Sequence, residues 1–109
     1  MRLRDYQWRT DETAIFPKNR AVEYLGLGLV SEAGEVAGKI KKVIRDKGGE
    51  FDSEAVEAIA FELGDVSWYM AQLASHLGLD WENDILAPNI EKLKSRSARG
   101  QLLGSGDNR

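Results

Sequence analysis

The 109-residue sequence contains no cysteine, a single histidine and only two prolines. The absence of cysteine excludes disulfides, zinc ribbons and thiol nucleophiles. Because His76 stands alone, a site built from several imidazoles is also excluded, so any metal ion must be held by oxygen atoms. No stretch approaches the roughly 20 apolar residues of a membrane span, and the charged start of the chain does not resemble a secretion signal. These absences predict a cytoplasmic protein that has no membrane partner.

An excess of charge of one sign is also lacking. The chain has 15 basic and 18 acidic residues and a formal net charge of -3, so nucleic acid is not expected as a partner. Neither a repeat nor a shift in composition marks a boundary, and the sequence therefore predicts one domain over residues 1–109. Residues 100–109 form a polar, glycine-rich tail, which is either a disordered end or a segment ordered by contacts elsewhere.

Hydrophobic periodicity predicts four helical segments and no strand. The first covers about residues 3–13 and ends before Pro17, and the second covers about residues 19–46 and ends at a glycine pair. The third begins after Asp52, a good N-cap, and is closed by Gly78. In the fourth, about residues 81–99, Pro88 either kinks the helix or marks the first turn of a shorter one. The short connection between the two long segments favours antiparallel packing in an all-α fold.

The two long segments each carry apolar residues at steps of three and four, which predicts a buried seam along each helix. The predicted core positions are Val22, Leu25, Leu29, Ala33, Val36, Ile40 and Val43 in the second segment and Val56, Ile59, Leu63, Val66, Met70, Leu73 and Leu77 in the third.

Each long segment also carries two acids at positions i and i+3, namely Glu32 with Glu35 and Glu62 with Asp65. This spacing places both carboxylates on one face of a helix. About three such pairs are expected by chance in a chain with this many acids, and three are present, so spacing alone does not identify a site. The two pairs do directly precede predicted core positions, however, and antiparallel packing would bring them together near mid-helix.

Four carboxylates gathered in this way repel one another by roughly 4 kcal/mol per pair at about 4 Å and an effective dielectric constant near 20. A divalent cation removes that repulsion, and an all-oxygen site suits Mg²⁺ or Mn²⁺. The alternative is that these acids are solvated residues at the boundary of ordinary amphipathic helices. Periodicity does not decide between these two interpretations.

The segments GLVSEAGEVAGKIKK and FELGDVSWYMAQLA together resemble the Glu-x-x-Glu and Glu-x-x-Asp signature of MazG-like nucleoside triphosphate pyrophosphohydrolases, which belong to the all-α NTP pyrophosphatase superfamily. The resemblance extends to DYQWRTDETAIFP before these motifs and to NIEKLKSRSARGQLLGSGDNR after them. It implies a four-helix bundle that forms homodimers or homotetramers, binds Mg²⁺ and hydrolyses nucleoside triphosphates to monophosphate and pyrophosphate. The metal ligands that it implies are Glu32, Glu35, Glu62 and Asp65.

Several other residues are candidates for roles in such a site. Glu32 is the candidate general base, on the argument that one acid is spared from metal ligation. Lys39, one heptad after Glu32, shares its helix face and is either a phosphate contact or a solvated lysine. Tyr69, four residues after Asp65, faces the same way and could stack on a base, whereas Gln7 could read base edges.

The last segment contributes a further set of candidates. Asn89, Lys92 and Arg96 are spaced i, i+3 and i+7, so they share one helix face, and they match a family-like Asn-x-x-Lys-Leu-x-x-Arg pattern. They are candidates for phosphate or ribose binding. Where some relatives carry an extra glutamate before the first motif, this chain has Ser31, which leaves the identity of the general base open.

Two further functions remain as alternatives. One is a phosphoribosyl-ATP pyrophosphohydrolase, since that related all-α group shares the acidic site. The other is a non-catalytic helical module that binds a nucleotide or a protein. The intact set of four acids argues against a pure binding module, which has little need for clustered carboxylates.

Overall fold

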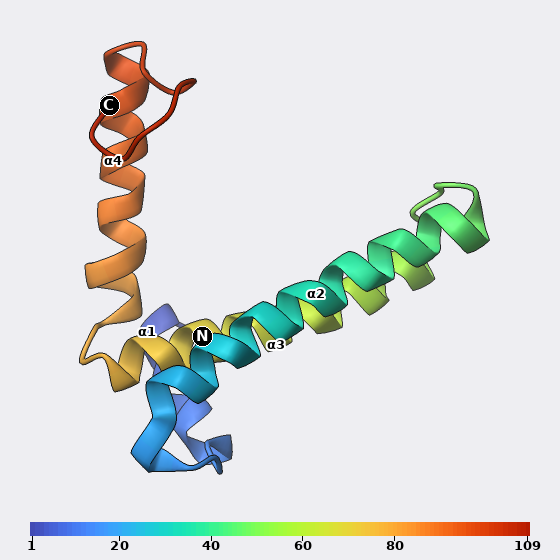
Figure 1. Cartoon of the computed structure of the whole chain (residues 1–109), viewed down its shortest axis with the longest axis horizontal. Coiled ribbons are helices and arrows are strands. Elements are labelled where there is room, and N and C mark those ends of the chain that lie inside the picture. The colour runs from blue at the N-terminus through green and yellow to red at the C-terminus, as the bar shows by residue number, and fades with distance from the viewer.

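The computed structural model describes residues 1–109 and is helical, with no strand (Figure 1). Its helices are α1 (Leu3–Thr10), α2 (Ala21–Lys47), α3 (Ser53–His76) and α4 (Ala87–Ala98). Two short 3-10 turns, η1 (Asp11–Thr13) and η2 (Lys18–Arg20), lie between α1 and α2, and a π-helical segment, η3 (Trp81–Leu86), joins α3 to α4. The all-α class is therefore confirmed. None of the helices combines the length and the apolar character that crossing a membrane requires.

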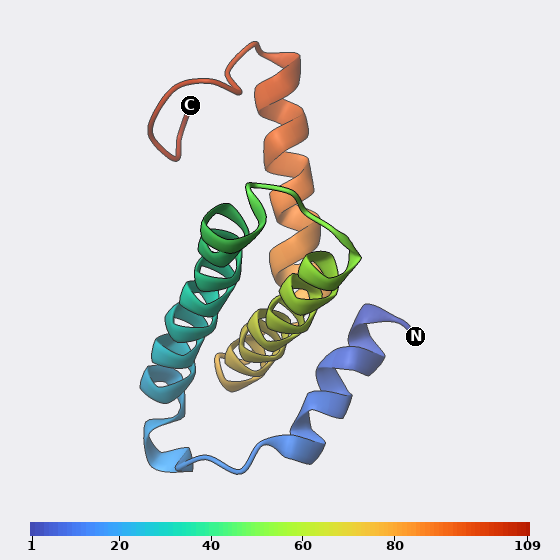
Figure 2. The same ribbon diagram turned by 90° about the vertical axis from the view of Figure 1, so that its right-hand side faces the viewer.

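Helices α2 and α3 pack side by side as a long antiparallel hairpin (Figures 1 and 2). Gly48 ends α2 in the left-handed conformation, with φ of 60°, which glycine adopts at no steric cost. Asp52 then caps α3, because its Oδ1 accepts a hydrogen bond of 2.8 Å from the backbone N–H of Ala55. The Nζ of Lys47 lies 3.0 Å from the other oxygen of Asp52. The predicted cap and the predicted antiparallel arrangement are both present.

Helix α1 is fixed against the base of this hairpin by the amide of Gln7. Its Nε2 donates to the Oγ of Ser75 at 3.0 Å and to the carbonyl oxygen of Leu79 at 2.9 Å, and its Oε1 accepts from the backbone N–H of Trp81 at 2.9 Å. The side chain is buried and these contacts occupy both ends of the amide. Gln7 therefore ties α1 to the end of α3 and to η3, a structural role that differs from the base-reading role expected from the sequence.

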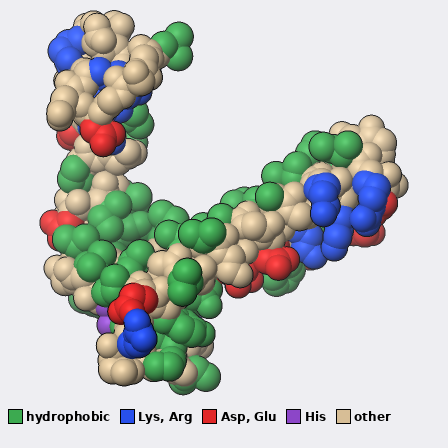
Figure 3. Space-filling view, in the orientation of Figure 1, with side chains coloured by type: hydrophobic (Ala, Val, Ile, Leu, Met, Phe, Trp, Pro, Cys, Tyr) green, Lys and Arg blue, Asp and Glu red, His purple; other side chains and the backbone are tan.

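The buried core is small and lies at the base of the hairpin. It consists of two clusters, one formed by Phe16, Ala21 and Leu25 and the other by Ala71, Ala74 and Trp81. Further along the hairpin only Val43 and Ala55 are buried, while large apolar side chains remain exposed on both helices. Figure 3 shows hydrophobic side chains along the surface of this arm. Much of the apolar surface of the two long helices is thus left uncovered by the chain itself.

Helix α4 projects from the base of the hairpin and runs away from it (Figures 1 and 2). Pro88 lies in the first turn of α4, directly after the π-helical segment η3, so it marks the start of a shorter α-helix. Its main contacts are with η3, and one chain therefore does not close a four-helix bundle. The tail folds back along α4, since Arg96 Nη2 donates to the carbonyl oxygen of Asp107 at 2.8 Å and Arg99 Nη2 to that of Arg109 at 2.7 Å.

Candidate functional site

Three carboxylates meet between the two helices of the hairpin. Glu32 comes from α2, whereas Glu62 and Asp65 come from adjacent turns of α3, and one carboxylate oxygen from each lies within 4.8 Å of the others. Glu32 and Glu62 are half-buried and Asp65 is exposed. A set of three carboxylates contributed by two helices is a donor set that suits a hard divalent cation such as Mg²⁺ or Mn²⁺.

The fourth predicted ligand, Glu35, lies outside this trio of Glu32, Glu62 and Asp65. It is exposed on α2, one turn after Glu32. The pKa of Glu32 is raised above its ordinary value, first by burial and then by the negative charges of Asp65, Glu62 and Glu35. The structure therefore gathers three of the four acids and keeps Glu35 at the edge of the same electrostatic field. The unrelieved repulsion within the trio is what a bound cation would remove.

The trio lies on the seam between α2 and α3 instead of flanking it. Glu32 and Glu62 are half-buried, whereas Ala33 and Leu63, which were predicted to be core residues, are exposed, Leu63 to 51%. The prediction for these two positions was therefore wrong by one residue, which corresponds to about 100° of rotation around each helix. Acids thus occupy inward positions in the middle of the hairpin.

Tyr69 lies near the trio, as its spacing predicts, but its ring is packed within the protein. The ring lies directly against Gly28 of α2, where a Cβ atom would overlap it. It also makes an edge-to-face contact with Trp68, at 5.0 Å between ring centroids. Burial, then Tyr24, and then the charges of Glu32 and Asp65 raise the pKa of Tyr69. The face of Tyr69 against Gly28 is therefore closed to a ligand.

Lys39 is half-buried on α2, about 10 Å along the helix axis from Glu32. It makes no hydrogen bond and no ion pair in the structure, in contrast to Lys47, which binds Asp52 and Glu54. Its Cα–Cβ bond tilts toward the N-terminus of α2, hence toward the trio. Lys39 therefore keeps its place among the candidate phosphate contacts.

The three candidates on α4 are not brought to the trio within one chain. Asn89 and Lys92 are exposed on the part of α4 that leads away from the hairpin. Arg96 is only 5% exposed, and its guanidinium is bonded to the carbonyl oxygen of Asp107. Arg96 thus anchors the tail, which differs from the substrate-binding role expected for it.

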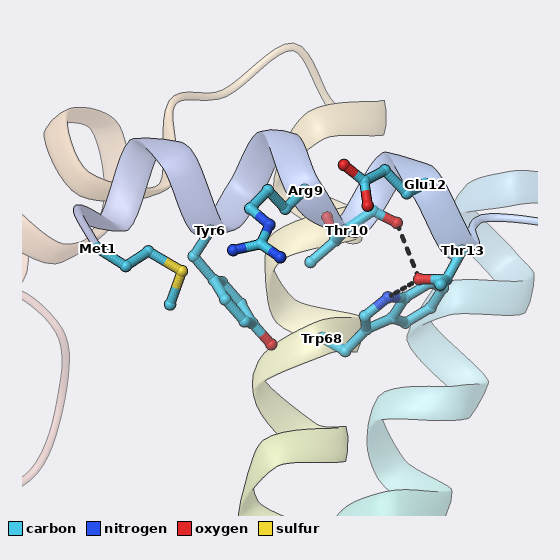
Figure 4. A pocket seen from close by; sticks show the side chains of 7 residues that line it. All are labelled: Met1, Tyr6, Arg9, Thr10, Glu12, Thr13 and Trp68. Atoms are coloured by element: carbon cyan, nitrogen blue, oxygen red, sulfur yellow. Dashed lines mark hydrogen bonds between the residues drawn. The ribbon is translucent and has the colours of Figure 1, made fainter.

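A cavity beside the trio includes residues that the sequence reasoning did not select. It measures about 320 Å³ and lies between α1, η1 and α3, with Tyr6, Arg9, Glu12, Thr13 and Trp68 among its walls (Figure 4). One signal for it is present in the sequence, because Tyr6, Arg9 and Thr13 share a helix face and Trp68 follows Asp65 by three residues. That pattern alone does not indicate a binding site, because the cavity forms only where α1 packs against α3.

The fold and the carboxylate trio define a class, the all-α proteins that gather carboxylates between two antiparallel helices. A family model described as the MazG nucleotide pyrophosphohydrolase domain matches residues 20–100, so the chain belongs to this family. It is also similar to the Gene 37 protein of Mycobacterium phage L5, with 44% identity over 110 residues that cover 95% of this chain and 96% of that relative. No solved structure matches the chain.

Proposed function

We propose that the protein is a Mg²⁺-dependent nucleoside triphosphate pyrophosphohydrolase, which cleaves between the α and β phosphates and releases a nucleoside monophosphate and pyrophosphate. The observation that carries this proposal is the approach of Glu32, Glu62 and Asp65 to within 4.8 Å of one another across α2 and α3. Membership of the MazG nucleotide pyrophosphohydrolase domain family supports the type of reaction. Mn²⁺ is expected to substitute for Mg²⁺, because both prefer oxygen ligands.

The acids divide into two roles. Glu32, Glu62 and Asp65 would hold the cation, which when bound supplies positive charge to the phosphate oxygens and lowers the pKa of water. Glu32 was the candidate base on the argument that one acid is spared from ligation. Because Glu35 lies outside the trio, we assign the role of the spared acid to Glu35 instead. Glu35 would accept the proton of the water that attacks the α phosphorus, while the bond from that phosphorus to the bridging oxygen breaks and pyrophosphate leaves.

A homo-oligomer, as a dimer or a tetramer, is part of the proposal. Exposed apolar residues recur on α2 at steps of three and four, and the stripe consists of Val30, Ala33, Ala37, Ile40 and Ile44. Leu63 and Ala60 are similarly exposed on α3. A soluble chain rarely leaves so large an apolar surface uncovered, and a second hairpin would cover it with coiled-coil-like spacing. Asn89 and Lys92, which cannot serve the trio of their own chain, would contact substrate bound to the partner.

The test is a panel of the eight common nucleoside triphosphates incubated with the protein and Mg²⁺. We expect equal amounts of monophosphate and pyrophosphate, and none after a chelator removes the metal. Release of orthophosphate alone, or no release, would overturn the proposal. Phosphoribosyl-ATP is included because a strong preference for it over all simple triphosphates would favour the alternative enzyme. Binding without turnover by the metal-loaded protein would favour the non-catalytic module.

A further inference from the structure

Two side-chain hydrogen bonds hold parts of the wall of the cavity between α1, η1 and α3. The indole Nε1 of Trp68 donates to the Oγ1 of Thr13 at 2.8 Å, which fixes the plane of the ring. Thr10, which is buried, accepts from Nε2 of Gln72 at 2.8 Å through its own Oγ1. With a volume of about 320 Å³, the cavity falls at the lower end of the range of small-molecule sites, roughly 300–1,000 Å³.

One cation in this cavity has no partner. Arg9 is exposed on α1 and extends beside the ring of Tyr6 at the mouth of the cavity (Figure 4), and its guanidinium takes part in none of the ion pairs or hydrogen bonds of the structure. A guanidinium carries five N–H donors in a planar fork, so it favours a ligand with two adjacent acceptors. Glu12 adds the only carboxylate among the lining residues. The cavity therefore offers paired donors, an acceptor and aromatic surface.

The cavity also adjoins the trio. Trp68 lies one helical turn, about 5 Å along the axis of α3, beyond Asp65. Tyr6, which lines this cavity, also lines a neighbouring one together with Gly64, the residue before Asp65. A nucleotide whose base occupied the cavity would therefore extend past Tyr6 toward the carboxylates.

We propose that this cavity binds the nucleobase of the substrate and selects guanine, with Arg9 as the residue that determines specificity. The inference rests on the proposed function, since it names the substrate of the same site. Guanine presents two adjacent acceptors, O6 and N7, which match the fork of Arg9. Adenine presents an amino group in place of O6, which would meet the N–H groups of Arg9 as a second donor. Glu12 accepts from the N–H groups of the guanine ring.

A second cavity, of about 280 Å³, shares Met1 and Tyr6 with the first and is also lined by Leu3, Gly64, Ser67 and Trp81. Its only charged side chain is that of Arg2, and its walls contain no carboxylate. It lacks the combination of donor fork and acceptor that distinguishes bases. The second cavity provides a control for the first, because a larger side chain at position 67 would fill it and leave Arg9 unchanged.

The test begins with guanosine and adenosine, which are uncharged and need neither metal nor turnover. Binding is followed by the NMR signal of the Trp68 indole N–H, with Trp8 and Trp81 as internal references. We expect guanosine to shift the Trp68 signal and adenosine to shift it far less, and Arg9→Ala to abolish the difference. The control Arg4→Ala, in which the lost guanidinium stacks on Trp8, should leave the difference between the two nucleosides unchanged, with Trp81 as the reference signal in this variant. Equal binding of both nucleosides, or loss of guanosine binding in Ser67→Leu and not in Arg9→Ala, would overturn the proposal.

The second part of the test measures hydrolysis of nucleoside triphosphates. The ratio of kcat/KM for dGTP to that for dATP should fall about tenfold or more in Arg9→Ala, because a bidentate contact to a base typically discriminates by that factor. The rate of pyrophosphate release from dATP should change far less. If the wild-type enzyme hydrolyses triphosphates without preferring dGTP, the base assignment is wrong while the proposed function stands. If no triphosphate is hydrolysed but guanosine binding depends on Arg9, the proposed function is wrong while the base site stands.

Discussion

The ring of Tyr69 on α3 lies against Gly28 on α2, so closely that a Cβ atom at position 28 would overlap the ring. The contact lies one turn before Glu32 on α2 and one turn after Asp65 on α3, so it sets the separation of the two helices where the trio forms. A glycine in a helix interior lowers helix stability by about 1 kcal/mol relative to alanine. At position 28 the glycine allows the two helices to approach closely.

Gly28→Ala is therefore expected to destabilise the protein, although alanine is the better helix former. Overpacking costs about 1–3 kcal/mol, which exceeds the gain of about 1 kcal/mol in helix propensity. The measurement is the free energy of unfolding from urea titration. Gly26→Ala is the matched control, since nothing lies within 4 Å of a Cβ there, and it should raise stability. A Gly28→Ala protein as stable as the control would contradict the contact with Tyr69.

A comparison of Glu32→Gln with Glu35→Gln distinguishes the metal ligand from the general base. If Glu32 holds the cation, Glu32→Gln should weaken Mg²⁺ binding by tenfold or more, and activity should fall with it. If Glu35 accepts the proton, Glu35→Gln should lower kcat by about 10²–10⁴ while Mg²⁺ binding is retained. Calorimetry of Mg²⁺ binding and steady-state kinetics distinguish the two. The reverse outcome, with binding lost in Glu35→Gln and only kcat lost in Glu32→Gln, would return the role of base to Glu32.

The metal-free protein is expected to lose stability as pH rises above the ordinary glutamate pKa of about 4.3. The pKa of Glu32 is raised in the folded state by burial and by Asp65, Glu62 and Glu35, so the folded protein binds a proton there more readily than the unfolded chain. The stability that this proton contributes is lost as pH rises from the pKa of Glu32 in the unfolded chain through its pKa in the folded protein. Thermal unfolding in a chelator at several pH values should show this decline, and Glu32→Gln should flatten it. A decline of the same size in Glu32→Gln would assign it to other groups.

Asp52 has the opposite dependence on pH. A hydrogen bond from the backbone N–H of Ala55, followed by the contact with Lys47, lowers the pKa of Asp52, so its contribution is present at neutral pH and is lost as pH falls below about 3.9. Asp52→Ala should lower the free energy of unfolding at pH 7, because the cap of α3 is lost. Asp52→Asn should cost less, since asparagine also caps helices. Chemical denaturation checks both, and equal losses would show that the ion pair with Lys47 matters more than the cap.

The exposed stripe on α2 and α3 leads to a prediction about assembly. Val30, 72% exposed, and Leu63, 51% exposed, are the positions whose replacement by lysine should shift the protein toward monomers. Light scattering after size-exclusion chromatography measures the mass in solution. Ile15→Lys is the control, because Ile15 is 95% exposed before α2 begins and lies outside the stripe. A wild-type protein that is monomeric at all concentrations tested would contradict the assembly and leave the uncovered stripe without an occupant.

Much of the fold follows from local sequence signals. The glycines at the helix ends, the Asp52 cap and the turn between α2 and α3 are decided by residues close in the chain, and the structure agrees with them at each place. The approach of Glu32 to Glu62 and Asp65 also follows, because antiparallel helices joined by a short turn bring their midpoints together. These features depend on helix geometry alone.

What the sequence does not reveal depends on contacts between distant residues. Apolar periodicity assigned Leu63 to the core, but each long helix has two apolar stripes, and the one facing its partner helix contains the acids. The direction of α4 depends on how Gln7 holds the backbone of Trp81, a contact across 74 residues. The position of the tail likewise depends on Arg96. No local sequence pattern predicts that this arginine is buried.

The uneven distribution of buried residues has a consequence for how stability is shared along the arm. The base of the hairpin is anchored by Leu25, Phe16 and Trp81, whereas the middle has carboxylates where other hairpins have hydrophobic contacts. Local opening therefore costs less free energy in the middle of the arm than at its base. Because a cation at the trio would join α2 to α3 at that point, occupancy of the site and closure of the arm are thermodynamically linked, and each strengthens the other by the same factor.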